Sequence, residues 1–325
     1  MSRAARILLY TIPLLLTSGD ALAWGLHTHV YFAQLLIWAV PLLDPALRRA
    51  VLRHPRLAMA GACMPDLALV GPHLQSDAFV QTHRWHTAHD LLIAAGDEAE
   101  QAIAVGYASH LLVDVIAHNH FVPAHEKLLA DIPWLTHVAV EWAMDAHIAR
   151  HAFAHPAELL LDNDLDVSDF AARHFGCTGS LALKAVRVLA KADHALRRSR
   201  IPQACYRLLR LDRTLKPRFD DYIQATAGRL AQINRVLNRE APAWEAELSC
   251  PVTKKARLRP FTRTDLRALL PLPQDLFQPE GCEAASRCAT STCQHPLAGY
   301  PWHVGRPSGR LVGLEPNLRP DASRA

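Results

Sequence analysis

The sequence predicts an all-α protein, mainly because apolar residues recur at helical spacing and alternating patterns typical of β-strands are scarce. The first such segment covers residues 29–53, where apolar positions repeat every three or four residues. Pro41 interrupts it. A second helix is expected to begin after this interruption, with Asp44 as its N-cap and Pro45 at its first position.

Further helices are expected along the chain in order. Residues 57–82 contain two glycines and two prolines, which favours a short segment followed by a long loop. A strong helical pattern covers 97–119 and ends before Pro123. The remaining helices are predicted at 134–152, 180–198, 201–212 and 217–239.

The first 23 residues indicate export. Arg3 and Arg6 precede a short apolar run from Ile7 to Leu16, and Ala-Leu-Ala at 21–23 is a small-x-small cleavage site. The apolar run is shorter than the roughly 20 residues of a membrane span, which disfavours a retained anchor. We expect residues 1–23 to be a signal peptide and a mature chain beginning at Trp24, periplasmic or extracellular.

The composition divides the mature chain in two. Residues 24–245 form the predicted helical domain, whereas ten of the 22 prolines fall in the last 76 residues. Residues 246–325 are therefore predicted to be an irregular Cys- and Pro-rich extension with a tail. Its four cysteines suit two disulfides in an oxidising compartment, with a thiolate metal site as the alternative; these are Cys250, Cys282, Cys288 and Cys293.

Histidine spacing supplies the functional prediction. Fifteen of the 19 histidines lie between His27 and His155, and several stand near carboxylates at helical spacing. His110 and Asp114 are four residues apart in an apolar stretch, where an unpaired carboxylate is costly. His137 and Glu141 repeat this spacing. Two helices facing each other could supply these nitrogen and oxygen ligands to one cavity, which suits zinc without excluding iron or manganese.

These motifs resemble the bacterial zinc-dependent phospholipase C family, whose fold is shared with zinc-dependent single-strand nucleases. The resemblance runs in order through Trp24-Gly-x-x-Thr-His29, Gly61-Ala-Cys-Met-Pro-Asp66, Thr82-His83-Arg-Trp85, His110-x-x-x-Asp114-x-x-x-x-x-His120 and His137-x-x-x-Glu141. It implies a multi-helix zinc phospholipase C-like domain with three zinc ions. The nine implied metal ligands are Trp24, His29, Asp66, His83, His110, Asp114, His120, His137 and Glu141.

The resemblance also implies how the ligands are shared. One zinc is expected at Asp66, His83, His110 and Asp114. A second would use His29 and the free amine of Trp24, with Asp114 as the bridge, and a third would use His120, His137 and Glu141. Three choices stay open: His27 for His29, His86 or His89 for His83, and His118, which is better aligned on helix geometry, for His120.

The implied activity is hydrolysis of phospholipid headgroups, with Asp66 acting on the attacking water. The alternatives are a single-strand nuclease and a non-catalytic metal-binding protein. A net charge of +4 is too weak and dispersed to argue for a stable nucleic-acid partner. The partner is expected to be a phospholipid or membrane surface, and the protein a monomer. We also expect His147, His151 and His155 to form a solvated helix face.

Overall fold

The computed structural model describes residues 25–122, 125, 133–246 and 272–278. Among these residues every regular element is a helix, which confirms the all-α prediction. The expected signal peptide and Trp24 lie outside the described residues, as do the four cysteines and most of the expected extension. No described helix combines the length and the apolarity that crossing a membrane requires.

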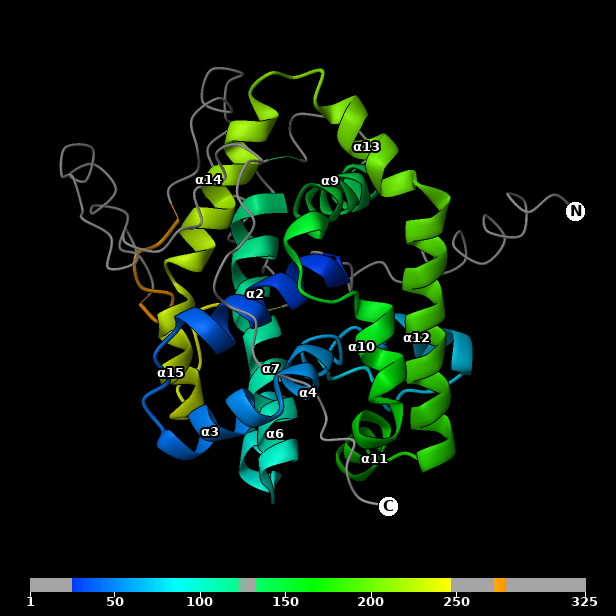
Figure 1. Cartoon of the computed structure of the whole chain (residues 1–325), viewed down its shortest axis with the longest axis vertical. Coiled ribbons are helices and arrows are strands. Elements are labelled where there is room, and N and C mark those ends of the chain that lie inside the picture. The colour runs from blue at the N-terminus through cyan, green and yellow to red at the C-terminus, as the bar shows by residue number, and fades with distance from the viewer. Residues whose placement is uncertain (1–24, 123–124, 126–132, 247–271, 279–325) are drawn as a thin grey trace, which may run out of the picture. The chain divides into compact units, whose positions relative to one another are not determined.

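Helix α7 (Glu98–Ile116) is the centre of the fold and is buried over its last 15 residues. It begins at Asp97, whose side chain accepts a hydrogen bond from the backbone N–H of Glu100. Around it pack α2 (Leu26–Ala39), α3 (Pro45–Arg53), α4 (Pro55–Gly61) and α6 (Trp85–Ala94). Figure 1 shows α2 crossing in front of α7, with α4 beside the two.

The crossing of α4 and α7 is unusually close. A Cβ atom on Gly106 of α7 would lie 1.8 Å from the Ala58 carbonyl oxygen of α4. A Cβ atom on Gly61 would lie 2.3 Å from the Ile103 carbonyl oxygen of α7. The two glycines therefore let the backbones touch, and this contact brings the end of α4 next to His110.

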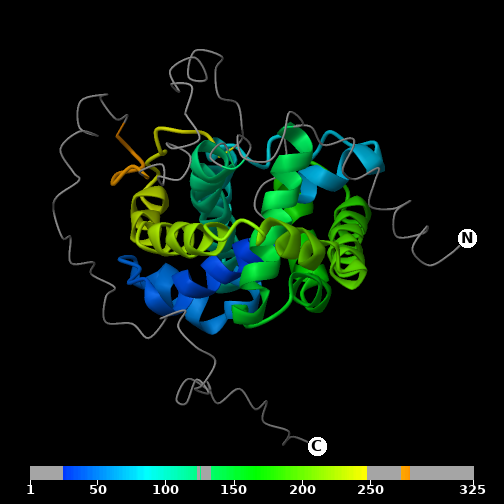
Figure 2. The same cartoon turned by 90° about the horizontal axis from the view of Figure 1, so that it is seen from above.

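The second half of the chain covers the other side of this core. Helices α9 (Pro133–Ile148), η3 (Ala149–His151), α10 (Pro156–Asp162) and α11 (Asp164–His174) lead into α12 (Gly179–Ser199) and α13 (Ile201–Leu209). α13 packs along α9, and α12 packs against α10 and α11. Helices α14 (Leu215–Ala227), η4 (Leu230–Gln232) and α15 (Ile233–Leu237) follow, with α15 packed against α7. Figure 2 shows α14 and α12 at opposite sides of the helical body.

Several predicted boundaries differ from the structure. Residues 57–82, expected to be a short segment followed by a long loop, contain most of α4 and also α5 (Leu67–Val70) and η1 (Pro72–Leu74). Helices α6, α10 and α11 were not predicted. The helix expected to reach 152 ends at Ile148. The prediction of a solvated histidine face was wrong for His147. This side chain is buried and lies within hydrogen-bond distance of Tyr206 and Asp220.

Candidate metal centre

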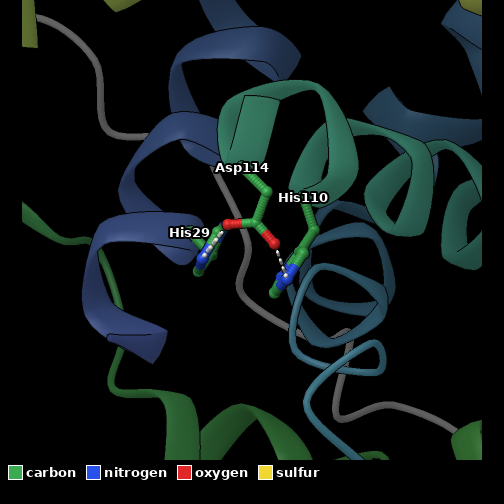
Figure 3. A group of neighbouring side chains, drawn as sticks. All are labelled: His29, His110 and Asp114. Atoms are coloured by element: carbon green, nitrogen blue, oxygen red, sulfur yellow. Dashed lines mark ion pairs between the residues drawn. The ribbon is translucent and has the colours of Figure 1, made fainter. Parts of the chain in front are cut away.

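Asp114 lies at the middle of a buried group of histidines. Its Oδ2 is 2.9 Å from Nε2 of His110, one turn earlier on α7, and its Oδ1 is 3.3 Å from Nε2 of His29 on α2. The rings of His29 and His110 stack with centroids 3.6 Å apart. Figure 3 shows the two oxygens of Asp114 turned toward these two different histidines. The two oxygens of this buried carboxylate therefore face imidazole rings from two different helices.

Two further ligand candidates enter from the segments that flank the short helix α5. Asp66 follows α4 and His83 precedes α6. Nε2 of His83 is 3.3 Å from Nε2 of His110 and 3.7 Å from Oδ1 of Asp66. Two sets of ligand atoms thus lie close enough to hold an ion, and they share His110: His29, His110 and Asp114; and Asp66, His83 and His110.

Hydrogen bonds outside these groups fix their orientation. Nδ1 of His110 lies 2.8 Å from the Ala62 carbonyl oxygen at the end of α4. That carbonyl can only accept, so Nδ1 carries the proton and Nε2 offers its lone pair to the site. Thr82 donates its hydroxyl to the Pro65 carbonyl oxygen at 2.7 Å, which ties the Asp66 segment to the His83 segment. Tyr107 of α7 donates to the Thr82 carbonyl oxygen as well.

A third group combines His118, His137 and Glu141. Nε2 of His137 is 2.7 Å from Oε1 of Glu141, one turn later on α9. His118 follows Asp114 by four residues and so lies near the same face, within η2 (Ala117–Phe121), which continues α7 as a π-helical turn. All three residues are buried.

His120, the implied third-site ligand, is not brought into this group. Its ring lies edge-on to Trp244 at 6.1 Å between centroids, and its Nε2 has no hydrogen-bond partner among the described residues. Of the sequence alternatives the structure therefore groups His118 with His137 and Glu141, and ligation by His120 stays a prediction.

The other open choices also have distinct positions. His27 points away from Asp114, toward Asp145, Asp193 and His155. His86 is exposed, and neither it nor His89 belongs to a group of ligand atoms found among the described residues. Trp24 lies outside those residues, so its role as a ligand stays a prediction.

Asp145 is a functional candidate that the sequence did not single out. It lies one turn beyond Glu141 on α9 and accepts hydrogen bonds from Thr28 N at 3.0 Å and Thr28 Oγ1 at 2.7 Å. It also accepts from His27 N at 3.3 Å, so it caps the first turn of α2 from another helix. A Cβ atom on Gly25 would lie 2.1 Å from its carboxylate. The stripe of His137, Glu141 and Asp145 at four-residue spacing was the available signal.

Burial dominates the electrostatics of the centre. Burial lowers the pKa of His83 to about 3 and that of His118 to about 4, so both rings are neutral and able to ligate. Burial raises the pKa of Asp66 to about 7 and that of Glu141 to about 8. Burial opposes ionisation of Asp114 too, but His110 and His29 together hold its pKa well below the usual range.

The residues present fit zinc. Both oxygens of Asp114 and Oε1 of Glu141 are buried and face imidazole nitrogens at 2.7–3.3 Å, and buried Oδ1 of Asp66 has no hydrogen-bond partner among the described residues. Unpartnered buried carboxylate oxygens are costly unless a cation neutralises them. Neutral imidazoles and carboxylates are the nitrogen and oxygen ligands that zinc accepts in proteins.

The sequence comparisons agree with this geometry. The family described as zinc-dependent phospholipase C matches residues 28–231. This chain belongs to that family. The matched region begins at Thr28, includes each residue of the three groups and ends within η4. No curated protein and no solved structure matches the chain.

Proposed function

We propose that this zinc-dependent phospholipase C homologue is an exported phosphodiesterase that hydrolyses phospholipid headgroups at a three-zinc centre. The observation that carries the proposal is the position of Asp114, whose two oxygens face two different histidines. A bridging carboxylate is the arrangement expected where two ions act on one phosphodiester. The separate group of His118, His137 and Glu141 suits the third ion.

Bound zinc and the surrounding residues would have different roles in hydrolysis. Bound zinc lowers the pKa of a water molecule from 15.7 to about 7 and neutralises charge on phosphoryl oxygens. Oδ1 of Asp66 is buried and has no hydrogen-bond partner among the described residues, which supports a role in accepting the proton of the attacking water. The neutral rings of His83 and His118 keep their lone pairs available at physiological pH. The buried setting excludes bulk water and strengthens these interactions.

Parallel assays on the purified mature protein test the proposal. We expect about three zinc ions per chain by elemental analysis and turnover of phosphatidylcholine, with none of single-stranded DNA. Asp114→Asn should lose zinc and activity together, whereas Asp44→Asn, at the exposed cap of α3, should keep both. Less than one zinc per chain in the native protein contradicts the metal centre. Full zinc occupancy with turnover of DNA but not of lipid moves the protein to the nuclease alternative.

Processing at Trp24 has its own test. We propose that export exposes the amine of Trp24, which then serves as a ligand beside His29. A mature chain with one extra residue before Trp24 should bind less zinc and lose most of its activity, because the free amine is displaced. The matched control is a chain that begins at Trp24 by engineered cleavage. Equal zinc content and equal activity in the two proteins would remove this ligand from the centre.

A further inference from the structure

One exposed surface combines positive charge with exposed leucines. It lies on α13, the residue before it and the turn that follows, and its members belong to none of the groups of metal-ligand atoms found among the described residues. We call it the arginine–leucine surface, formed by Arg200, Arg207, Leu208, Arg210, Leu211 and Arg213. The side chains of Leu208 and Leu211 are 67% and 80% exposed, although leucine is usually buried.

The local backbone puts the leucines together. The N–H of Leu211 bonds to the carbonyl oxygen of Leu208 at 3.1 Å, so helical geometry continues past Leu209. Arg207, Leu208 and Leu211 are therefore neighbours on one helix face. The opposite face is occupied, because Leu209 is buried and the Tyr206 hydroxyl lies 2.8 Å from Nδ1 of His147 on α9. The arginine–leucine surface thus points away from the helix on which α13 rests.

Nearby acidic groups do not neutralise this surface. The stretch from 197 to 216 holds seven basic residues and one acidic residue, whereas the whole chain has a net charge of only +4. That one acid, Asp212, is 2.7 Å from the Arg218 guanidinium. Asp220 pairs with Lys216 at 2.7 Å. All four arginines of the surface are exposed, no described residue forms an ion pair with any of them, and Arg210 lies over the Tyr206 ring at 5.6 Å.

We propose that the arginine–leucine surface docks the protein onto anionic phospholipid bilayers. Guanidinium groups form bidentate hydrogen bonds with phosphate oxygens. Exposed leucines flanked by arginines suit the boundary between headgroups and acyl chains, where apolar side chains enter and charged heads stay in water. Charge complementarity therefore favours a membrane whose lipids carry net negative charge.

The same observations disfavour nucleic acid as the occupant. Sequence-tolerant binding of single strands relies on aromatic side chains on which bases stack. The aromatic residue of α13, Tyr206, has its hydroxyl at His147, and the guanidinium of Arg210 lies 5.6 Å above its ring. A nucleic-acid backbone of charged phosphates also offers no apolar surface against which the two exposed leucines could be buried.

The arginine–leucine surface and the proposed metal centre are connected through α9. This helix carries His137 and Glu141, and α13 packs along it. The benefit to catalysis rests on the proposed function, because a lipid hydrolase gains from being held at the bilayer that contains its substrate. The binding step itself needs no catalysis and can be measured alone.

Vesicle co-sedimentation of the full mature protein tests the proposal. We expect strong binding to phosphatidylcholine vesicles containing about 30 mol% phosphatidylglycerol, and weak binding to phosphatidylcholine alone. Binding should fall when salt rises from about 0.1 to about 0.5 M, because the Debye length shortens. Arg207→Ser with Arg213→Ser should lower the partition coefficient about 25-fold, since each arginine at an anionic surface contributes about fivefold. Leu208→Ser with Leu211→Ser should lower it at least tenfold.

Matched variants elsewhere serve as controls. Arg48→Ser with Lys184→Ser removes the same charge from exposed positions on α3 and α12, and Leu43→Ser removes a leucine that is 73% exposed. Both controls should bind vesicles like the native protein. Equal binding by the surface variants and the native protein, or binding of single-stranded DNA without binding of vesicles, overturns the proposal. Hydrolysis of a monomeric short-chain phosphatidylcholine should be unchanged in all variants, so a failure of docking stays distinguishable from a failure of the proposed activity.

Discussion

Replacing Asp145 tests how strongly α9 holds the start of α2. The carboxylate accepts three hydrogen bonds, from Thr28 N, Thr28 Oγ1 and His27 N. Asp145→Ala leaves the buried N–H of His27 unpaired, which costs about 1–3 kcal/mol. It also removes two bonds from Thr28, each worth about 1 kcal/mol, although the Thr28 N–H keeps the Gly25 carbonyl oxygen at 2.9 Å. We therefore expect the free energy of unfolding to fall by about 3–5 kcal/mol. For a domain of this size the midpoint of thermal unfolding should fall by roughly 6–20 °C.

Thermal unfolding followed by far-UV circular dichroism measures this effect, with and without a chelator. Thr28→Val removes only the hydroxyl bond and should cost about 1 kcal/mol, while Thr28→Ser should restore it. Asp44→Ala is the comparison, because Asp44 caps α3 through two backbone N–H groups at an exposed position and its loss should cost about 1 kcal/mol. An Asp145→Ala protein that unfolds within about 2 °C of the native midpoint would refute this account of the cap.

Three other predictions concern the core and the centre. Gly106→Ala should destabilise the protein by about 3 kcal/mol, because its Cβ would meet the Ala58 carbonyl oxygen at 1.8 Å; Gly179→Ala, which meets nothing within 4 Å, should be nearly neutral in the same denaturant titration. His118→Ala should reduce zinc content by about one ion per chain, whereas His120→Ala should not change it. The reverse result in elemental analysis would show that His120, as the family resemblance implies, is the ligand and His118 is not. Zinc binding to the metal-free protein should release protons below about pH 7, because Asp66 and Glu141 have pKa values of about 7 and about 8 and must deprotonate to ligate. The affinity for zinc should therefore fall as pH falls. Calorimetry in two buffers of different ionisation enthalpy measures the proton release, because the apparent binding enthalpy then depends on the buffer. The same binding enthalpy in both buffers would contradict the prediction.

Local signals predicted the parts of the fold that local chemistry controls. Asp44 accepts hydrogen bonds from the N–H groups of Ala46 and Leu47, and Pro45 opens α3, as the sequence indicated. Gly61 suggested a loop, but it lies within α4 because only a glycine allows the close approach of α7. Short helices such as α10 were missed because their stability comes from packing on neighbours rather than from a repeating pattern.

The candidate site divides in the same way. The four-residue spacings of His110 with Asp114 and of His137 with Glu141 were readable because one helix turn aligns them. Helix spacing from Asp114 already favoured His118, which the structure groups with His137 and Glu141, whereas only the family resemblance favoured His120. Asp145 continues the four-residue spacing of His137 and Glu141, but its partners, His27 and Thr28 at the start of α2, are brought to it only by the fold.

The glycine crossing of α4 and α7 has a consequence for the size of the metal cage. Gly61 and Gly106 stand 45 positions apart in the sequence, yet each faces the backbone of the other helix. Any side chain at either position would push the helices apart and move Asp66 away from His110. Two residues that offer no ligand atom from a side chain thus control the distance between Asp66 and His110, and with it the size of ion that these two ligands can hold.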